Sequence, residues 1–238
     1  MTQRKMKKAI KALALVLCMV MAVSVFEYAG VSAKERKPVT IIKEDYSDVI
    51  SGAAGKITVM CYRERLSLAG KTKAVKKINK AIKKLANKYG IDDVFEYAES
   101  RVADEYPLDY DNNVYYDTMD CDRTYDDGKT ISVRIFRLTN FGGVTNYLYA
   151  NGNYDLKTGK SVKITKASGK SLEYIKERLI SNIHADYGDD ATEEAEAYIN
   201  GLKENQFNYY INADGLCVVC FDSYDLGMGP SWYEYIIE

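Results

Sequence analysis

The stretch over residues 131–160 constrains the fold most, because short alternating runs of apolar and polar residues are separated there by glycine turns. Apolar residues recur at every second position at its start, the period of a half-buried strand, at Ile131, Val133 and Ile135. Gly142-Gly143 supplies the backbone freedom for a reversal. Tyr147 and Tyr149 then share one face of the next strand, and Gly159 permits a second turn. The stretch therefore predicts a β-scaffold.

The rest of the chain mixes further strands with amphipathic helices. We expect strands over residues 55–62, 114–121, 161–165 and 232–237, and a hairpin over residues 207–222. We expect helices over residues 71–89, 91–101, 171–185 and 192–203. This order predicts an α+β fold over residues 55–238, an antiparallel sheet with two to three helices packed on it.

The N-terminus has the pattern of a secretory signal peptide. Five basic residues precede an apolar run over residues 12–26, and Val31-Ser32-Ala33 provides a small-x-small cleavage site. We expect a signal peptide over residues 1–33. The alternative is an uncleaved anchor, with residues 9–26 as a membrane tether. Residues 34–54 are polar and are expected to form a linker. The protein should therefore be secreted or extracytoplasmic, in association with the cell envelope.

Charge and tyrosine content narrow the classes of partner. Cleavage after Ala33 removes five basic residues and one acidic residue, which leaves 28 Lys and Arg against 33 Asp and Glu. A net charge of −5 argues against a nucleic-acid partner and makes a basic protein plausible. The chain has 21 Tyr against six Phe and one Trp, and tyrosine suits surfaces that face glycans or proteins.

The four cysteines beyond residue 33 do not form a recognised motif. Cys217 and Cys220 have the spacing of a redox or zinc pair, but their apolar context is that of a strand, which directs the two thiols to opposite faces. Buried thiols and separate bridges to Cys61 and Cys121 both remain open.

The sequence has no motif that identifies a reaction. His184 is the only histidine and stands near the end of a predicted helix, without a serine or cysteine nucleophile in a known arrangement. The acidic residues around Asp109 depart from an EF-hand, because Val114 replaces the required glycine. We therefore expect no catalytic residue, no metal and no cofactor.

Several motifs along residues 56–237 together resemble one bacterial extracytoplasmic module of unassigned function. These motifs are Gly142-Gly143, Asn153 to Lys160 (NYDLKTGK), Gly215 to Phe221 (GLCVVCF) and Tyr224-Asp225-Leu226. The module forms the outer part of the RsiV-type anti-sigma factor and is appended to some polysaccharide deacetylases. Val144-Thr145 stands where the module usually has Ala-His.

The resemblance implies an exported binding module, since the outer domain of the RsiV-type protein recognises lysozyme, a basic protein. About eight residues precede the possible tether over residues 9–26, which leaves no room for the sigma-binding segment, and we expect no attached deacetylase domain either. We expect a non-catalytic binding domain of the cell envelope, with a lysozyme-like protein or a cell-wall glycan as ligand. The residues expected to contact it are Tyr147, Tyr149, Tyr154, Tyr224 and Trp232.

Two alternatives come from other classes. The first is a cell-wall hydrolase, or an accessory to one, that uses paired carboxylates. The second is a structural envelope protein whose lysine-rich helix face over residues 71–88 contacts an anionic polymer, although a solvated helix face explains the same pattern.

Overall fold

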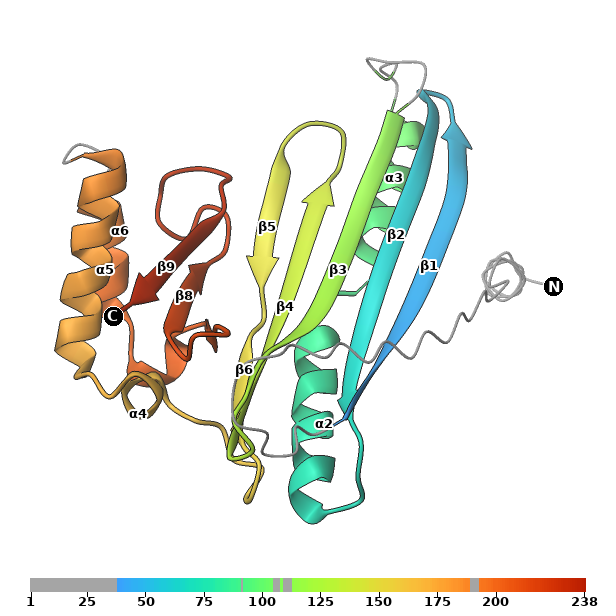
Figure 1. The fold of residues 1–238 in the computed structure, drawn as a ribbon. Coiled ribbons are helices and arrows are strands. Elements are labelled where there is room, and N and C mark those ends of the chain that lie inside the picture. The colour runs from blue at the N-terminus through green and yellow to red at the C-terminus, as the bar shows by residue number, and fades with distance from the viewer. Residues whose placement is uncertain (1–37, 91, 105–107, 109–112, 189–192) are drawn as a thin grey trace.

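The computed structural model describes residues 38–90, 92–104, 108, 113–188 and 193–238 (Figure 1). Its strands are β1 (Val39–Gly52), β2 (Gly55–Leu68), β3 (Asn113–Asp126), β4 (Thr130–Asn140), β5 (Thr145–Tyr149), β6 (Gly152–Asp155), β7 (Tyr209–Ile211), β8 (Cys217–Phe221) and β9 (Tyr233–Ile237). Its α-helices are α2 (Lys73–Ala86), α3 (Asp92–Ala103), α4 (Ile164–Ser168), α5 (Leu172–Tyr187) and α6 (Glu193–Gly201), and a 3₁₀ turn, η2, spans Glu204–Gln206. The predicted α+β fold is confirmed.

The strands form two sheets. The large sheet has the order β1-β2-β3-β4-β5, and β6 pairs with the other end of β4. All its pairs are antiparallel except β2 with β3, which run parallel from Ile57 beside Asn113 to Arg63 beside Met119. The small sheet has the antiparallel order β7-β8-β9. The segment that links β2 to β3 contains α2 and α3, as a parallel pair requires a crossover.

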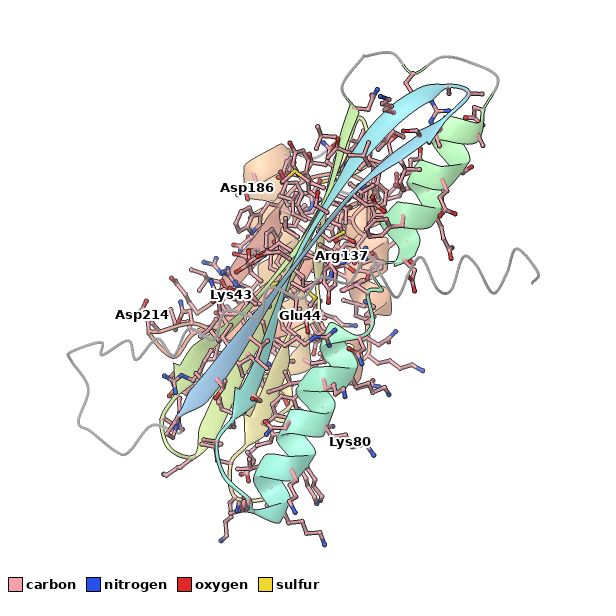
Figure 2. All side chains as sticks on the ribbon, turned by 90° about the vertical axis from the view of Figure 1, so that its right-hand side faces the viewer. Lys43, Glu44, Lys80, Arg137, Asp186 and Asp214 are labelled. Atoms are coloured by element: carbon pink, nitrogen blue, oxygen red, sulfur yellow. The ribbon has the colours of Figure 1, made fainter. Side chains whose placement is uncertain are left out.

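Helices α2 and α3 cover one face of the large sheet (Figure 1). Thr72 caps α2 by accepting from the Val75 N–H, and the helix buries an apolar stripe that includes Val75, Ile78 and Ile82. The opposite side of α2 carries the lysines. Figure 2 shows Lys80 extended away from the helix and Arg137 among the side chains of the interior. A solvent-exposed helix face explains the lysines without a partner, because the helix already buries its apolar stripe.

The small sheet lies between the large sheet and the helices α4, α5 and α6. Tyr209, Cys217 and Val219 pack with Ile175, Leu179 and other residues of these helices in one core cluster. The residues between them in β7 and β8 point to the opposite side, toward the large sheet, where they pack with Tyr149 and Phe136. They are Tyr210, Val218 and Cys220. Beside β4, β5 and β6 the chain therefore forms four layers. They are helix α2, the large sheet, the small sheet, and the helices α4, α5 and α6.

The observed secondary structure differs from the sequence-based expectation in two segments. Most of the expected linker over residues 34–54 is strand β1, paired along its whole length with β2. β1 reads as polar because it is an edge strand whose residues are mostly half-exposed or exposed. The expected strand over residues 161–165 is reduced to one bridge between Ser161 and Tyr154, and α4 begins at Ile164.

All four cysteines of the described chain are free and buried. Each belongs to a different hydrophobic cluster, so none packs in the same cluster as another. Cys217 and Cys220 face opposite sides of β8, as predicted. The structure thus has buried thiols, and the alternative of disulfide bridges is wrong for it.

The expected signal peptide and the tether over residues 9–26 lie outside the described residues. Within the part that the structure describes, no helix has the length and apolar character needed to cross a bilayer.

Candidate binding face

The large sheet leaves part of its second face uncovered, on the side opposite α2 and α3. Met60 and Tyr116 are partners in the β2–β3 pair, and their exposed fractions are 45% and 42%. Partner residues in a sheet point to the same side, so the pairs Tyr62–Thr118 and Leu138–Tyr147 extend this face toward β5. We call the aromatic residues on this side the aromatic face: Tyr62, Tyr116, Phe136, Tyr147 and Trp232.

Trp232 is the most exposed ring of the aromatic face. It stands just before β9 in the small sheet, yet its ring stacks on Phe136 of the large sheet, with centroids 4.9 Å apart and planes at 26°. Its centroid is 6.0 Å from that of Tyr147, and 51% of the residue is exposed. Aromatic pairs at these separations stabilise one another, which fixes the exposed ring in place. Of the predicted contact residues, Tyr147 and Trp232 are therefore brought together.

Tyr149 and Tyr154 are core residues, which corrects the expectation that they contact a ligand. The exposed fraction of Tyr149 is 0% and that of Tyr154 is 4%. Tyr149 is the cross-strand partner of Phe136 and packs beside it at a centroid distance of 5.3 Å. Tyr154 lies in the cluster between the large sheet and α2. The two-residue period of the strand could not show that Tyr149 is buried. Tyr149 and Tyr147 lie on the same face of β5, but Tyr149 is covered by the small sheet.

Tyr224 lies in the loop between β8 and β9, and its exposed fraction is 54%. The loop is fastened to β5, since the Ser223 N–H donates to the Tyr147 carbonyl and the Tyr147 N–H donates to Ser223 Oγ, each at 2.8 Å. Tyr224 is the one non-glycine residue of the described chain with positive φ, at 72°. This conformation is costly for a side chain with a Cβ atom. The hydrogen bonds at Ser223 thus hold the next residue, Tyr224, in an exposed position.

Tyr62, Tyr116 and Phe136 belong to the same surface but were not among the predicted contact residues. The signal that could have found them is the two-residue period of their strands, which places Phe136 on the same side as Arg134 and Leu138. The strand pairing is the missing information, because the β3–β4 pair places Tyr116 beside β4 and the β2–β3 pair adds Tyr62 to the same face.

Carboxylates border the aromatic face at Glu64, Asp120 and Asp122. Asp120 is the partner of Phe136 in the β3–β4 pair. Burial raises the pKa of Asp120, and the negative charges of Glu64 and Asp122 add to that rise. Glu64 accepts from the Tyr62 hydroxyl at 2.6 Å and the Cys121 N–H at 3.1 Å, and Lys43 Nζ lies 3.0 Å from it. Lys43 pairs with Glu64, and Arg134 Nη2 lies 3.2 Å from Asp122, so the excess of negative charge on this border comes from Asp120.

His184 forms no part of this face. It pairs with Glu196 across α5 and α6. In the portion of the chain that is described, no three side chains of His, Cys, Asp or Glu gather as a metal site would require.

Comparison with known proteins gives likeness of fold only. No family model matches the chain, and no curated protein matches it in sequence. Among solved structures, a DUF3298 family member from Bacteroides fragilis is similar over 86% of this chain and 92% of its own, at 15% identity and a TM-score of 0.48. A DUF3298 family protein from Pseudomonas aeruginosa PAO1 is similar over 85% of this chain and 91% of its own, at 9% identity and the same TM-score of 0.48.

Proposed function

We propose that this chain is an exported, non-catalytic binding domain of the bacterial cell envelope, and that the aromatic face contacts its ligand. The observation that carries the proposal is the Trp232 ring, which is half exposed and yet fixed by stacking on Phe136. A fixed, exposed aromatic ring offers a large contact area at a low cost in conformational entropy. Exposed aromatic residues that gather on one face are typical of interaction sites.

Two ligand classes fit this surface, a lysozyme-like protein and a cell-wall glycan. The net charge of −5 beyond residue 33 supports the basic protein, as does Asp120 beside Phe136 at the edge of the aromatic face. The flat rings of Trp232 and Tyr147 support the glycan, because Trp and Tyr combine an apolar face with a polar edge. The resemblance to the RsiV-type outer module favours the protein ligand.

The first experiment measures binding of the chain from Lys34 onward to lysozyme and to soluble wall glycan, at low and at physiological salt. Trp232→Ala should weaken binding at least about tenfold, which is the loss expected of a central aromatic contact. Tyr224→Ala tests the loop in the same assay, and unchanged binding by a folded Tyr224→Ala would exclude Tyr224 as a contact. Tyr174→Ala is the matched control, because Tyr174 is a 39% exposed tyrosine on α5, away from the aromatic face.

Binding to lysozyme at both salt concentrations would identify the protein ligand. Binding to glycan alone would identify the wall polymer. If neither ligand binds, or if Trp232→Ala and Tyr174→Ala behave alike, the aromatic face is not the binding site.

The hydrolase alternative has its best candidates in Glu64 and Asp120. Their pKa values shift in opposite directions: burial acts to raise the pKa of Glu64, but hydrogen bonds from Tyr62, Cys121 and Lys43 lower it overall, whereas the pKa of Asp120 is raised. Such a divergence is typical of an acid and base pair. Both oxygens of Glu64 already accept hydrogen bonds, however, so Glu64 has a structural role. Release of wall fragments that is lost in Asp120→Asn would favour the hydrolase over the binding domain.

A further inference from the structure

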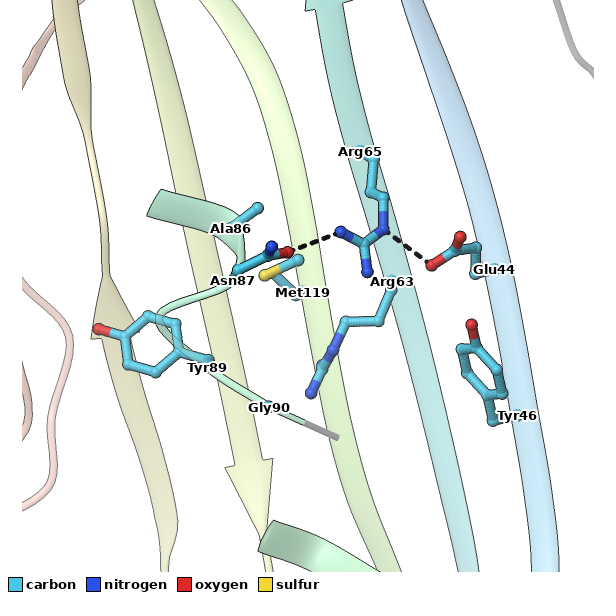
Figure 3. A pocket seen from close by; sticks show the side chains of 9 residues that line it. All are labelled: Glu44, Tyr46, Arg63, Arg65, Ala86, Asn87, Tyr89, Gly90 and Met119. Carbon is cyan, nitrogen blue, oxygen red and sulfur yellow. Dashed lines mark hydrogen bonds and ion pairs between the residues drawn. The ribbon is translucent and has the colours of Figure 1, made fainter. Parts of the chain in front are cut away.

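A small pocket lies on the helix-covered side of the large sheet, opposite the aromatic face. It has a volume of about 150 Å³ and opens between β1, β2 and the segment that follows α2. Figure 3 shows its walls, with Glu44 and Tyr46 on β1, Arg63 and Arg65 on β2, and Asn87, Tyr89 and Gly90 on the segment after the helix. Ala86 and Met119 complete the lining.

Arg63 is a buried, charged residue in the wall of this pocket, and one of its N–H donors makes no hydrogen bond to the described residues. Its exposed fraction is 2%. Its Nη1 and Nη2 atoms donate to the Asp117 carboxylate at 2.8 Å and 2.6 Å, but its Nε atom has no hydrogen-bond partner among the described residues. A buried guanidinium N–H without a partner is unfavourable, and a bound water or anion beside it would relieve that cost.

Positive charge exceeds negative charge among the buried side chains beneath the pocket. Arg137 also donates to both oxygens of Asp117, from Nε at 2.8 Å and from Nη2 at 2.6 Å. Two buried guanidinium groups therefore share one buried carboxylate. Asp93 approaches Arg137 to 3.8 Å, but its side chain is 64% exposed and its charge is screened by solvent. The interior thus holds an excess of positive charge next to the pocket, which favours an anion there.

Arg65 stands at the mouth of the pocket with its guanidinium held in place. Its Nε donates to Glu44 at 2.9 Å and its Nη1 donates to Asn87 at 2.8 Å (Figure 3). Arginine side chains are suited to carboxylate and phosphate because their donors form a planar fork. Arg63 from within and Arg65 from the mouth can therefore approach one ligand from two sides.

We propose that this pocket binds a small oxyanion, a phosphate or a short carboxylate, through Arg63 and Arg65. At about 150 Å³ the pocket has room for an ion of this size together with ordered water. Tyr46 lines the same wall as a neutral hydroxyl, and burial raises its pKa further above neutral pH. The site is independent of the proposed function, since the aromatic face is on the other side of the sheet.

The test uses the full chain, with inorganic phosphate and acetate as separate probes at constant ionic strength set by NaCl. Calorimetry should show saturable binding of at least one probe, and the Arg63 Nε–H resonance should shift as the site fills. Arg65→Gln should weaken binding at least about tenfold, whereas Arg65→Lys should lose less because it retains the charge. The matched control is Arg178→Gln, since the side chains of Arg65 and Arg178 are both 41% exposed and both form an ion pair.

The two probes distinguish the two kinds of oxyanion, because a phosphate site should bind acetate weakly and a carboxylate site the reverse. The proposal is overturned if neither probe binds saturably, or if Arg178→Gln weakens binding as much as Arg65→Gln. It is also overturned if the Arg63 Nε–H resonance stays unchanged while a probe binds. None of these outcomes bears on the aromatic face.

Discussion

At the scale of single residues, Asp117 is the side chain whose loss should cost the most. Its carboxylate is fully buried and accepts four hydrogen bonds from Arg63 and Arg137. Asp117→Asn leaves two buried guanidinium groups without their counter-charge, so we expect the free energy of unfolding to fall by about 3–5 kcal/mol. Urea denaturation measures this. The control is Asp93→Asn, whose exposed side chain should change stability by less than about 0.5 kcal/mol.

The same carboxylate predicts how stability depends on pH. Burial acts to raise the pKa of Asp117, but the hydrogen bonds from Arg137 and Arg63 outweigh it and lower the pKa below the ordinary value. Because the native pKa lies below the unfolded one, the stabilisation is fully present above about pH 4 and is lost as the pH falls through the native value. Denaturation midpoints between about pH 5 and pH 2 should fall more steeply for the natural chain than for Asp117→Asn. Parallel curves would contradict the assignment.

At the scale of elements, Asn79 joins α2 to the end of β2. Its side chain accepts from the Leu68 N–H and donates to the Leu68 carbonyl, each at 2.9 Å, as a neighbouring strand would. Asn79→Ala leaves both backbone groups without a partner, so we expect a loss of about 1–3 kcal/mol in spite of the better helix propensity of alanine. Chemical denaturation against Lys80→Ala, an exposed position on the same helix, provides the comparison. Equal stability of the two variants would show that water replaces the side chain.

The elements also show what the sequence could and could not predict. Helix α2 was predictable because its apolar stripe and its Thr72 cap are local patterns. The turn at Gly159 was predictable in the same way, and its φ is 68°. Strand β1 was not, because an edge strand with few buried residues has the composition of a linker. The bridge at Ser161 is a single pair, too short to carry a period of its own.

The aromatic face was predictable only in part. Tyr147 and Trp232 stand out by residue type, and the structure brings them together. Tyr149 could not be separated from Tyr147, because covering by the small sheet depends on contacts between distant parts of the chain. The pocket at Arg63 was not predictable at all, since Arg63 and Asp117 are 54 residues apart and meet only through the parallel pair.

At the scale of the whole molecule, the two sheets are joined by specific hydrogen bonds as well as by packing. The Ile211 N–H donates to Ser132 Oγ at 2.8 Å, and Asn153 Nδ2 donates to the Tyr209 carbonyl at 2.7 Å. We therefore expect the sheets to unfold together. Trp232 fluorescence reports the junction between the sheets and circular dichroism reports the backbone, so both should give one midpoint in urea. Two separated midpoints would show that the small sheet unfolds independently.

The parallel pairing of β2 with β3 has a consequence for how the chain acquires its fold. The hairpin of β1 and β2 is local, and β3 pairs locally with β4, but Ile57 meets Asn113 only after more than fifty intervening residues have been placed. Closing such a long loop costs chain entropy before any contact compensates for it. The first hairpin can form before β3 is in place beside it, which leaves the inner edge of β2 unprotected until then. Early partners of this chain, such as chaperones, should therefore recognise that transient edge.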